Sequence, residues 1–330
     1  MRLDRRALLA GAAATAALTA RTAQAAQPVY SPTVSLKGTS VLITGCSSGF
    51  GRLTAELLAR AGARVFATMR GLPRAEGDEL AALAKAEGLD LHVIPLDVTE
   101  LPQVNAAVKE AERINGGPLG VLVNNAGIGI TSPVEVQDME ATRLIFDTNV
   151  FGPHRMARAV LPGMRKAKRG LIIQISSQLG RVIVPHSGHY SATKFALEAM
   201  SEQLAYELVP HGIDVSIIEP GGYPPKVWVN RNAYSLALKE RSLAVHSAGY
   251  PEHVARMGQE DGSGRTNDPM DVARAIAALI AQPPGTRPLR LPVSGGAIPQ
   301  TPINRVTAEV QTVWLGNSPY GPLVRAVHGR

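Results

Sequence analysis

Tyr190 and Lys194, four residues apart, are the residues of this chain whose types and spacing point most directly to chemistry. They fall in a predicted helix, where positions i and i+4 share a face. A free tyrosine hydroxyl has a pKa near 10 and is a poor base at neutral pH until a nearby cation stabilises the phenolate. Lys194 is spaced to supply that cation. The same spacing also arises by chance on solvated helix faces, so the pair needs support from other residues.

Ser177 and a glycine-rich segment give that support. Ser177 follows a predicted strand at 171–175, and the carboxyl end of a strand is where α/β sheets bind ligands. The segment TGCSSGFG at 44–51 follows the first predicted strand and opens a helix. Glycines there let the backbone turn tightly and approach a pyrophosphate at the positive end of the helix. Its spacing differs from the common GxGxxG, and a plain glycine turn is the alternative.

The elements that must position these residues follow from an alternation of short apolar runs with longer helical patterns, which is typical of a parallel sheet. We predict seven strands, at 41–43, 64–68, 91–94, 121–123, 171–175, 215–218 and 289–291. Helices are predicted at 51–61, 75–87, 103–114, 141–161, 190–209 and 270–281. The fold class is therefore α/β, a Rossmann-type doubly wound sheet with helices on both faces, in one domain at 40–296. Residues 222–266 break the alternation and are predicted to form a substrate loop or lid with a helical piece.

Residues 1–25 are predicted to be a signal peptide, followed by a linker at 26–39. Arg5 and Arg6 precede an alanine-rich apolar run at 7–20, and Ala23-Gln24-Ala25 offers a small-x-small cleavage site. The run is too short to span a bilayer comfortably, so no transmembrane helix is expected in the mature protein. The twin arginine resembles a Tat signal, which carries folded proteins across the bacterial inner membrane, and predicts export by that machinery to the periplasm. An ordinary Sec signal and a basic N-terminus of a cytoplasmic protein are the alternatives.

Composition excludes several classes of protein. Without residues 1–25 the formal charge falls from +7 to +4, and the basic run at 165–169 lies between a helix and a strand, as in a solvated turn. Aromatic residues make up 4% of the chain, too few for a base-stacking platform, so no nucleic-acid partner is expected. Cys46 is the only cysteine, which rules out an internal disulfide. About 300 residues that are 45% hydrophobic can bury one large core, and we predict no metal site.

Several motifs in a fixed order make the chain resemble the short-chain dehydrogenase/reductase family. They cover nearly the whole mature chain and comprise TGCSSGFG, Asn124-Asn125-Ala126-Gly127, Asn149, Ser177, Tyr190, Lys194 and Pro220-Gly221. The TGxxxGxG spacing resembles the simple branch of the family, not the extended sugar-nucleotide epimerases. Together with VFATMR at 65–70, it is also similar to the retinol and 17β-hydroxysteroid dehydrogenase-like members.

The resemblance implies a catalytic tetrad of Asn149, Ser177, Tyr190 and Lys194. Tyr190 would be the general acid/base at the substrate oxygen, and Ser177 would hold that oxygen by a hydrogen bond. Lys194 would stabilise the phenolate and bind the nicotinamide ribose, while Asn149 would support a water that links Lys194 to solvent. These roles agree with the physical interpretation, since a catalytic acid/base works best near the operating pH. The hydride chemistry belongs to the cofactor.

The resemblance also implies the cofactor contacts and, with them, the kind of cofactor. The contacts are Gly45, Ser47, Ser48, Gly49, Phe50, Gly51, Arg70, Asp97, Val98, Asn125, Ala126, Gly127, Tyr190, Lys194, Pro220 and Gly221. An acidic residue at the end of the second strand would accept the ribose hydroxyls of NAD, but Met69 stands there and Arg70 follows. A guanidinium suits the 2′-phosphate of NADP. We therefore predict NADP, with NAD possible and a solvated Arg70 as the alternative.

Three positions leave alternatives open. Asp97 is expected beside the adenine ring, or else caps the helix that starts near Gln103, and Asn124 chiefly stabilises the centre of the sheet. Many relatives carry a threonine four residues after Pro220-Gly221, where it helps to hold the nicotinamide carboxamide. Here Pro225 offers neither a hydroxyl nor a backbone N–H, which puts that clamp in doubt.

The predicted function is an NADP(H)-dependent oxidoreductase that interconverts a secondary alcohol and a ketone or aldehyde of modest size and low polarity. Its mostly apolar pocket is expected to involve Gln178, Leu179, Val182, His186, Tyr223, Val227 and Trp228, although His186 also fits a plain loop residue. The alternative is a non-catalytic exported NADP-binding or sensor protein. Three alternatives stay open for the C-terminal extension at 297–330: it packs over the active site, it packs against a second subunit, or it is loosely ordered. The resemblance implies a homo-oligomer.

Overall fold

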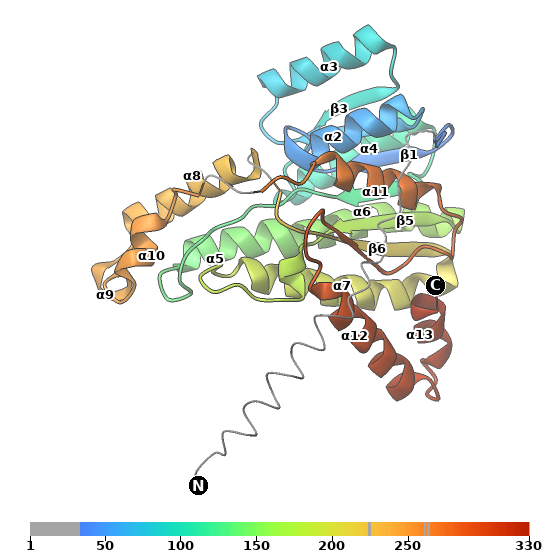
Figure 1. The fold of residues 1–330 in the computed structure, drawn as a ribbon. Helices are drawn as coiled ribbons and strands as arrows, with labels where there is room; N and C mark the ends of the chain where they lie inside the picture. Colours follow the sequence, from blue (N-terminus) through green and yellow to red (C-terminus); the bar gives the residue numbers. More distant parts are fainter. Residues whose placement is uncertain (1–33, 224–225, 261, 263–264, 330) are drawn as a thin grey trace. The chain divides into compact units, whose positions relative to one another are not determined.

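The seven predicted strands form one parallel sheet in a computed structural model, which describes residues 34–329 apart from 224, 225, 261, 263 and 264. They are β1 (Ser40–Ile43), β2 (Arg64–Met69), β3 (Leu91–Pro95), β4 (Val121–Asn124), β5 (Gly170–Ile175), β6 (Ile213–Pro220) and β7 (Arg290–Val293). Their order in the sheet is β3-β2-β1-β4-β5-β6-β7. The chain therefore winds outward from β1 to β3 and then from β4 to β7, and the predicted doubly wound fold is confirmed (Figure 1).

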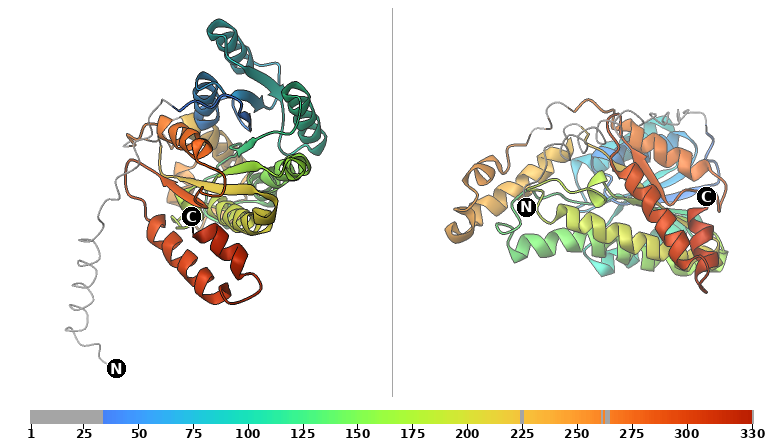
Figure 2. Two further views of the ribbon diagram at one scale, coloured as in Figure 1. Left: turned by 90° about the vertical axis from the view of Figure 1, so that its right-hand side faces the viewer. Right: turned by 60° about the horizontal axis from the view of Figure 1, so that its bottom comes forward.

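Helices cover both faces of this sheet, which explains why its strands are apolar almost throughout. On one face α2 (Gly49–Arg60) packs against α11 (Met270–Ala281), and α3 (Ala75–Glu87) packs on β3. On the other face lie α4 (Leu101–Asn115), α6 (Gly152–Ala167) and α7 (Tyr190–Leu208), as the left view of Figure 2 shows. The strands β1, β4 and β6 are buried at every position.

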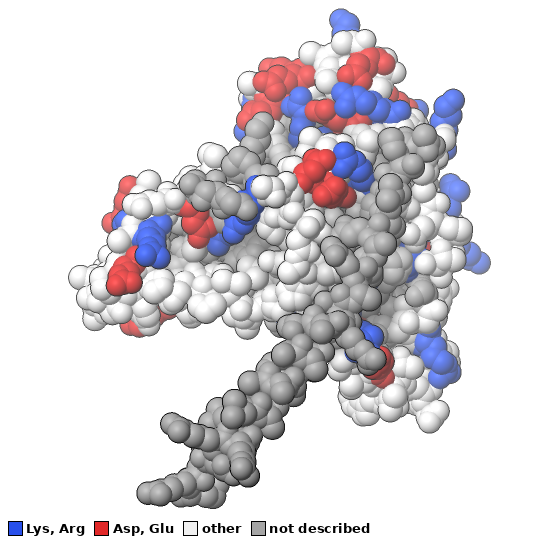
Figure 3. All heavy atoms as spheres, in the orientation of Figure 1, with Lys and Arg blue, Asp and Glu red and all other residues white. Residues whose placement is uncertain are grey.

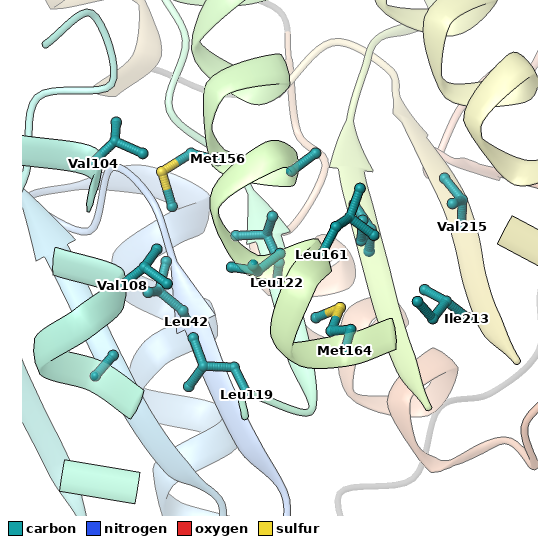
Figure 4. Packing of buried hydrophobic residues seen from close by; sticks show 14 of the residues in the cluster. Leu42, Val104, Val108, Leu119, Leu122, Met156, Leu161, Met164, Ile213 and Val215 are labelled. Carbon is teal, nitrogen blue, oxygen red and sulfur yellow. The ribbon is translucent and has the colours of Figure 1, made fainter. Parts of the chain in front are cut away.

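The larger described core cluster fills the space between the sheet and α4, α6 and α7. Val108 of α4 and Met156 and Met164 of α6 meet the sheet residues Leu42 and Leu122 there, as Figure 4 shows. All five side chains are at most 4% exposed. Apolar burial of this extent supplies the stability that a chain with one cysteine cannot draw from a disulfide bond.

The predicted helix at 141–161 is divided in the structure into three consecutive segments. They are α5 (Met139–Phe146), a π-helical turn η1 (Asp147–Phe151) and α6. The periodicity of the sequence missed this division because a π turn adds residues to a helix without breaking its continuity. The N-terminus of α5 is capped by the carboxylate of Asp138, which accepts a hydrogen bond from the N–H of Ala141.

The described part of residues 222–266 holds three helices where the sequence predicted one helical piece. They are α8 (Lys226–Arg241), α9 (Ala244–Ser247) and α10 (Pro251–Arg256), and they extend beyond the carboxyl ends of the strands, next to α5 (Figure 1). Arg241 forms an ion pair with Asp138 at 2.6 Å, and Tyr250 donates a hydrogen bond to Glu135 at 2.9 Å. Polar contacts therefore tie the segment to the loop that follows β4.

The C-terminal extension forms α12 (Gln300–Leu315) and α13 (Gly321–His328). Val327 is buried in the core cluster that α7 also joins, and the hydroxyl of Tyr206 on α7 lies 2.6 Å from Nε2 of His328. The extension folds onto α7 of its own chain, a placement that was not among the three that the sequence left open. The short turns η2 (Gln178–Gly180) and η3 (Val209–His211) flank α7.

Charged side chains of both signs lie side by side over α2 and α3 on the face seen in Figure 3. Arg60 of α2, for example, pairs with Glu56 of its own helix and with Glu87 of α3. Within the part of the chain that the structure describes, no helix has the length and apolar character to cross a bilayer. The predicted signal peptide at 1–25 lies outside the described residues.

Candidate active site

A cavity of about 830 Å³ lies at the carboxyl ends of the strands and between them and α8 and α10. Its lining includes three of the four predicted tetrad residues and most of the predicted cofactor contacts. These are Gly45, Ser47, Ser48, Gly49, Phe50, Arg70, Asp97, Val98, Asn125, Ala126, Gly127, Ser177, Tyr190, Lys194, Pro220 and Gly221. Of the predicted residues, Asn149 and Gly51 lie behind this lining, where each supports residues that face the cavity.

Tyr190 and Lys194 open α7 and meet as their spacing predicted. The ammonium nitrogen of Lys194 lies 5.7 Å from the centre of the Tyr190 ring and donates a hydrogen bond to the carbonyl oxygen of Ile175 at 2.8 Å. Lys194 is 6% exposed, so its charge acts on the ring with little screening by bulk water. The hydrogen bond fixes the ammonium at the end of β5, beside the phenol.

Ser177 lies directly after β5 and begins the turn η2. Its hydroxyl oxygen accepts a hydrogen bond from the N–H of Leu179 at 3.1 Å, which fixes the direction of the side chain. The residue is 8% exposed and lines the same cavity as Tyr190. Because its hydroxyl hydrogen is not used in that bond, Ser177 keeps a donor for a ligand oxygen.

Asn149 lies in the π turn η1 and positions its neighbours through both ends of its amide. Its Oδ1 accepts from the N–H of Ile128 at 2.8 Å, and its Nδ2 donates to the carbonyl of Ile128 at 2.9 Å and to Thr193 Oγ1 at 3.1 Å. These bonds join the loop after β4 to α7, one residue before Lys194. The π turn thus places an amide where it can connect two walls of the cavity.

The glycine-rich turn between β1 and α2 fits a phosphate-bearing cofactor. A Cβ atom at Gly45 would lie 2.9 Å from Ala126 Cα, and one at Gly51 would lie 2.3 Å from the carbonyl oxygen of Gly45. Gly49 has a φ of +58°, in the left-handed region, and opens α2. The side chain of Ser48 makes no capping hydrogen bond, so the first N–H groups of α2 keep their capacity to bind an anion.

Asn125 shapes that turn through its side chain. Its Nδ2 donates to the carbonyl of Thr44 at 2.8 Å and to that of Gly45 at 3.1 Å, and Thr44 Oγ1 accepts from the backbone N–H groups of Asn125 and Ala126. The loops after β1 and β4 are therefore held together across the centre of the sheet. Asn124 is 2% exposed and has a long bond of 3.5 Å to the carbonyl of Pro153.

Arg70 lies just beyond β2, on the adenosine side of the cavity that the fold predicts. Its Nη2 donates to the hydroxyl of Tyr234 on α8 at 2.7 Å, a contact across 164 residues of sequence. Met69 before it is 1% exposed and points away from solvent. No acidic side chain therefore occupies the end of β2.

Asp97 lines the cavity but does not cap α4. Its Oδ1 accepts hydrogen bonds from the N–H and the hydroxyl of Thr99 at 2.9 and 2.7 Å, while Glu100 is the N-cap residue of α4. The capping alternative is wrong, because the carboxylate closes a turn two residues on instead. Val98, which follows Asp97, is 6% exposed.

Cys46 is enclosed within the glycine-rich turn. It is fully buried, its Sγ donates to the carbonyl of Ile43 at 3.3 Å, and burial raises its pKa to about 12. A thiol with that pKa carries almost no thiolate at neutral pH and is not a nucleophile.

The side of the cavity that residues 222–266 line carries residues that sequence reasoning did not select, among them Arg231, Tyr234, His253, Glu260 and Arg265. In the sequence, only the length of the segment 222–266 indicated a functional role. The segment has no periodic pattern that would identify individual positions in the cavity. The predicted pocket residues Gln178, Leu179, His186 and Tyr223 line the cavity, whereas Val182 does not. Pro225 and the side chains of Val227 and Trp228 lie outside the described residues.

His186 is more than a plain loop residue. Its φ is +61°, and its ring lies 3.4 Å, centre to centre, from the ring of His253 on α10. The loop after η2 and the segment 222–266 therefore meet at the mouth of the cavity.

Comparison with known proteins agrees with this arrangement. The model of the family described as short chain dehydrogenase matches residues 39–234. The chain belongs to this family. Among curated proteins, it is 40% identical over 204 residues to the 3-ketodihydrosphingosine reductase of Bacteroides thetaiotaomicron, which covers 62% of this chain and 71% of that protein. It is 42% identical over 185 residues to human retinol dehydrogenase 8, covering 55% of this chain and 58% of that protein.

Solved structures of short-chain dehydrogenases share the fold. A short-chain dehydrogenase from Streptomyces avermitilis is 32% identical, with a TM-score of 0.67, and the match covers 85% of this chain and 99% of that one. A metagenomic short-chain oxidoreductase in complex with NADP is 25% identical, with a TM-score of 0.62 and coverage of 79% and 99%. The family places this chain among the nicotinamide-dependent dehydrogenases and reductases, as its motifs predicted.

Proposed function

We propose that this short-chain dehydrogenase is an NADP(H)-dependent enzyme that interconverts a secondary alcohol and a ketone, or a primary alcohol and an aldehyde, with Tyr190 as general acid/base. The observation that carries the proposal is the meeting of Tyr190, Lys194 and Ser177 in the cavity that the glycine-rich turn also lines. The names of two relatives, a ketone reductase and a retinol dehydrogenase, support this class of reaction.

In the proposed reaction each side chain has a separate task. In the reductive direction, Ser177 and Tyr190 donate hydrogen bonds to the substrate oxygen and orient the carbonyl group. NADPH, when bound, supplies the hydride to the carbonyl carbon. Tyr190 gives its proton to the oxygen, and the ammonium of Lys194 stabilises the phenolate that remains. Asn149 holds the loop after β4 against α7, so that the two walls keep their spacing.

Turnover by the mature protein tests this proposal. NADPH oxidation should follow the addition of a ketone from a panel of carbonyl compounds and should fall at least a hundredfold in Tyr190→Phe, which keeps the ring but removes the hydroxyl. The alternative, a non-catalytic exported NADP-binding or sensor protein, predicts that both proteins bind NADPH and that neither oxidises it faster on addition of any ketone. Equal rates in the two proteins would argue against catalysis by Tyr190.

The choice of NADP over NAD rests on Arg70. Its guanidinium faces the cavity where an acidic residue would select NAD, and Tyr234 holds it in place. In Arg70→Ala we expect the Kd for NADPH to rise at least tenfold, about 1.4 kcal/mol, while that for NADH changes little. Arg60→Ala, which removes a surface arginine of α2 outside the cavity, is the control. A similar loss for both cofactors would contradict the assignment.

We also propose that the chain is exported through a Tat signal at 1–25 and assembles as a homo-oligomer. Replacement of Arg5 and Arg6 by lysines should leave the protein in the cytoplasm, as fractionation of a bacterial host would measure. Unchanged export would point to a Sec signal. Sedimentation analysis of the mature protein gives its oligomeric state, and a monomer at micromolar concentration would contradict the second part.

A further inference from the structure

One hydrogen bond connects the end of β2 with α8 at the cavity. The Nη2 atom of Arg70 donates to the hydroxyl oxygen of Tyr234 at 2.7 Å, between residues that are 164 positions apart in the chain. Both side chains line the cavity that Tyr190 and Lys194 also line. The segment 222–266 therefore contacts the strand end at which this type of fold binds the adenosine ribose of a dinucleotide.

The ring of Tyr234 is held by contacts that do not involve Arg70. It packs against the smaller described core cluster, which includes Leu238 of the same helix. The next residue, Ser235, is buried, and its Oγ accepts a hydrogen bond from the N–H of Thr131 at 2.9 Å. These contacts fasten α8 to the loop after β4. We therefore expect the phenol to keep its place at the cavity when Arg70 is replaced.

The bond between Arg70 and Tyr234 leaves both side chains able to donate to a ligand. The oxygen of Tyr234 accepts in this bond, so the hydroxyl hydrogen is not used in it. A guanidinium carries five N–H groups in a fixed fork, and this bond uses one of them. Arg74, by contrast, directs two of its nitrogens at the carboxylate of Glu76, each at 2.8 Å. The contact between β2 and α8 thus brings together a cation and a hydroxyl donor, which suits the oxygen atoms of a phosphate group.

We propose that Tyr234 is a second donor to the 2′-phosphate of NADP, beside Arg70, so that the bound phosphate joins α8 to the end of β2. This rests on the proposed use of NADP and adds a role for the segment 222–266 to it. The glycine-rich turn fits the rest of such a cofactor, since a Cβ at Gly45 or at Gly51 would clash with backbone atoms there.

The proposal makes the position of α8 depend on which cofactor is bound. A ligand shifts a conformational equilibrium only by the difference between its affinities for the two states. NADP gains the bond to Tyr234 only when α8 lies where the structure has it, and NAD has no 2′-phosphate with which to make that bond. NADP therefore stabilises this position of α8 more than NAD does.

Tyr234→Phe tests the phosphate contact, because it keeps the ring and removes only the hydroxyl. Calorimetry of the mature protein should give a Kd for NADPH that is about tenfold weaker than in the wild type, and an unchanged Kd for NADH. Tyr250→Phe is the matched control. Tyr250 belongs to the same segment and packs on the same core cluster, but its hydroxyl bonds to Glu135, and this variant should bind both cofactors as the wild type does. Unchanged NADPH binding in Tyr234→Phe would overturn the proposal.

A double-mutant cycle separates a direct contact from an effect that passes through Arg70. If Tyr234 donates to the phosphate itself, Tyr234→Phe should still weaken NADPH binding about threefold when Arg70 is already replaced by alanine. If Tyr234 only orients Arg70, the second substitution should have no further effect. That result would make Tyr234 a positioning residue and overturn the direct contact.

Hydrogen exchange measures the link between the phosphate and α8 without any turnover. At saturating cofactor, the backbone amides of α8 should exchange about threefold more slowly with NADPH than with NADH in the wild type, and equally with both in Tyr234→Phe. Equal protection by the two cofactors in the wild type would show that the phosphate does not hold α8, and would overturn that part of the proposal.

The binding measurements separate this inference from the proposed function. A wild type that binds NADH as tightly as NADPH would overturn the use of NADP itself. A preference for NADPH that Arg70→Ala abolishes and Tyr234→Phe leaves intact would overturn the role of Tyr234 alone, and the proposed NADP-dependent oxidoreductase would stand.

Discussion

Two parts of one row of residues spaced four apart on α7 have very different surroundings. Tyr190 and Lys194 in the first half lie beside the cavity, while Glu198, Glu202 and Tyr206, at the same spacing of four, are enclosed by β6, β7 and α13. In the enclosed half, Arg290 of β7 pairs with Glu198 at 2.8 Å and with Glu202 at 2.6 Å. Access, more than residue type, therefore distinguishes the two parts of the row. Charges that neighbouring groups pair with stabilise the fold, and charges beside a cavity can act on a ligand.

The largest expected effect comes from a substitution in the part of α7 beside the cavity, and it concerns activity. In Lys194→Met, kcat/KM should fall about a thousandfold, about 4 kcal/mol in transition-state free energy, because the phenolate of Tyr190 loses the nearby cation. Steady-state kinetics with any ketone that the wild type reduces gives this number. Glu198→Gln, one turn further along, should change kcat/KM no more than a few-fold in the folded protein. Comparable losses in both variants would erase the division between the halves.

The next effect concerns the stability that the enclosed charges of α7 provide. Arg290 is 6% exposed, and Arg290→Met would leave Glu198 and Glu202 buried without their cation. The free energy of unfolding, measured by urea denaturation, should fall by about 3 kcal/mol. Arg305→Met on α12 removes an exposed partner of Glu309 and should cost about 0.5 kcal/mol or less. If the two losses were similar, the enclosed charges would stabilise the fold no more than surface pairs do.

A third effect concerns pH. Burial and the charge of Glu198 raise the pKa of Glu219 to about 8, so the folded protein holds a proton that the unfolded chain releases near its ordinary pKa of 4.5. The stabilisation of the folded protein by this bound proton is fully present below pH 4.5 and is lost as the pH rises through 8. The titration of Glu219 should therefore lower the free energy of unfolding by on the order of 3 kcal/mol between pH 5 and pH 8.

Glu219→Gln isolates that contribution, since the amide resembles the protonated carboxyl and can still accept from Asn304, which now bonds Glu219 Oε2 at 2.7 Å. Denaturation curves at several pH values should be flatter for this variant than for the wild type in the same window. If the substitution left the slope of the unfolding free energy against pH unchanged, a group other than Glu219 would be responsible for the pH dependence.

The smallest effect tests the attachment of the C-terminal extension. The hydroxyl of Tyr206 donates to Glu202 at 2.5 Å and lies 2.6 Å from His328 of α13. Tyr206→Phe removes both contacts and should lower the free energy of unfolding by about 1 kcal/mol. Limited proteolysis should then release α13 sooner. Tyr320→Phe, at an exposed tyrosine before α13, should leave both readouts unchanged.

The sequence predicted the sheet and the cavity side of α7 well, because both depend on local patterns. Short, mostly apolar runs of three to five residues located all seven strands, and the pair Tyr190 and Lys194 needed only helix geometry to be placed on one face. Loops that follow strands gather at one edge of a parallel sheet, so Ser177 and the glycine-rich turn were predicted to meet the pair.

The contacts of the enclosed charges on α7 and of the cavity residues in the segment 222–266 could not be predicted in the same way. Arg290 reaches Glu198 across 92 residues, and Arg231 reaches Thr131 across 100, so no local pattern announces either contact. The sequence identifies the charged residues but not the residues that pair with them. Only the packing of distant segments decides which charges are balanced. For the same reason the expectation of a low-polarity pocket missed the arginines of the segment 222–266.

The π turn at Asp147–Phe151 has a consequence for how this chain can vary. Deleting one residue from the turn would rotate α6 against α5 by about 100°, carrying Met156 and Met164 off the sheet and moving Asn149 from the loop it holds. Many substitutions within the turn would be milder than that single deletion. At this point the chain constrains the number of residues more tightly than their identity, so alignments of its relatives should show gaps on either side of the turn before they show one inside it.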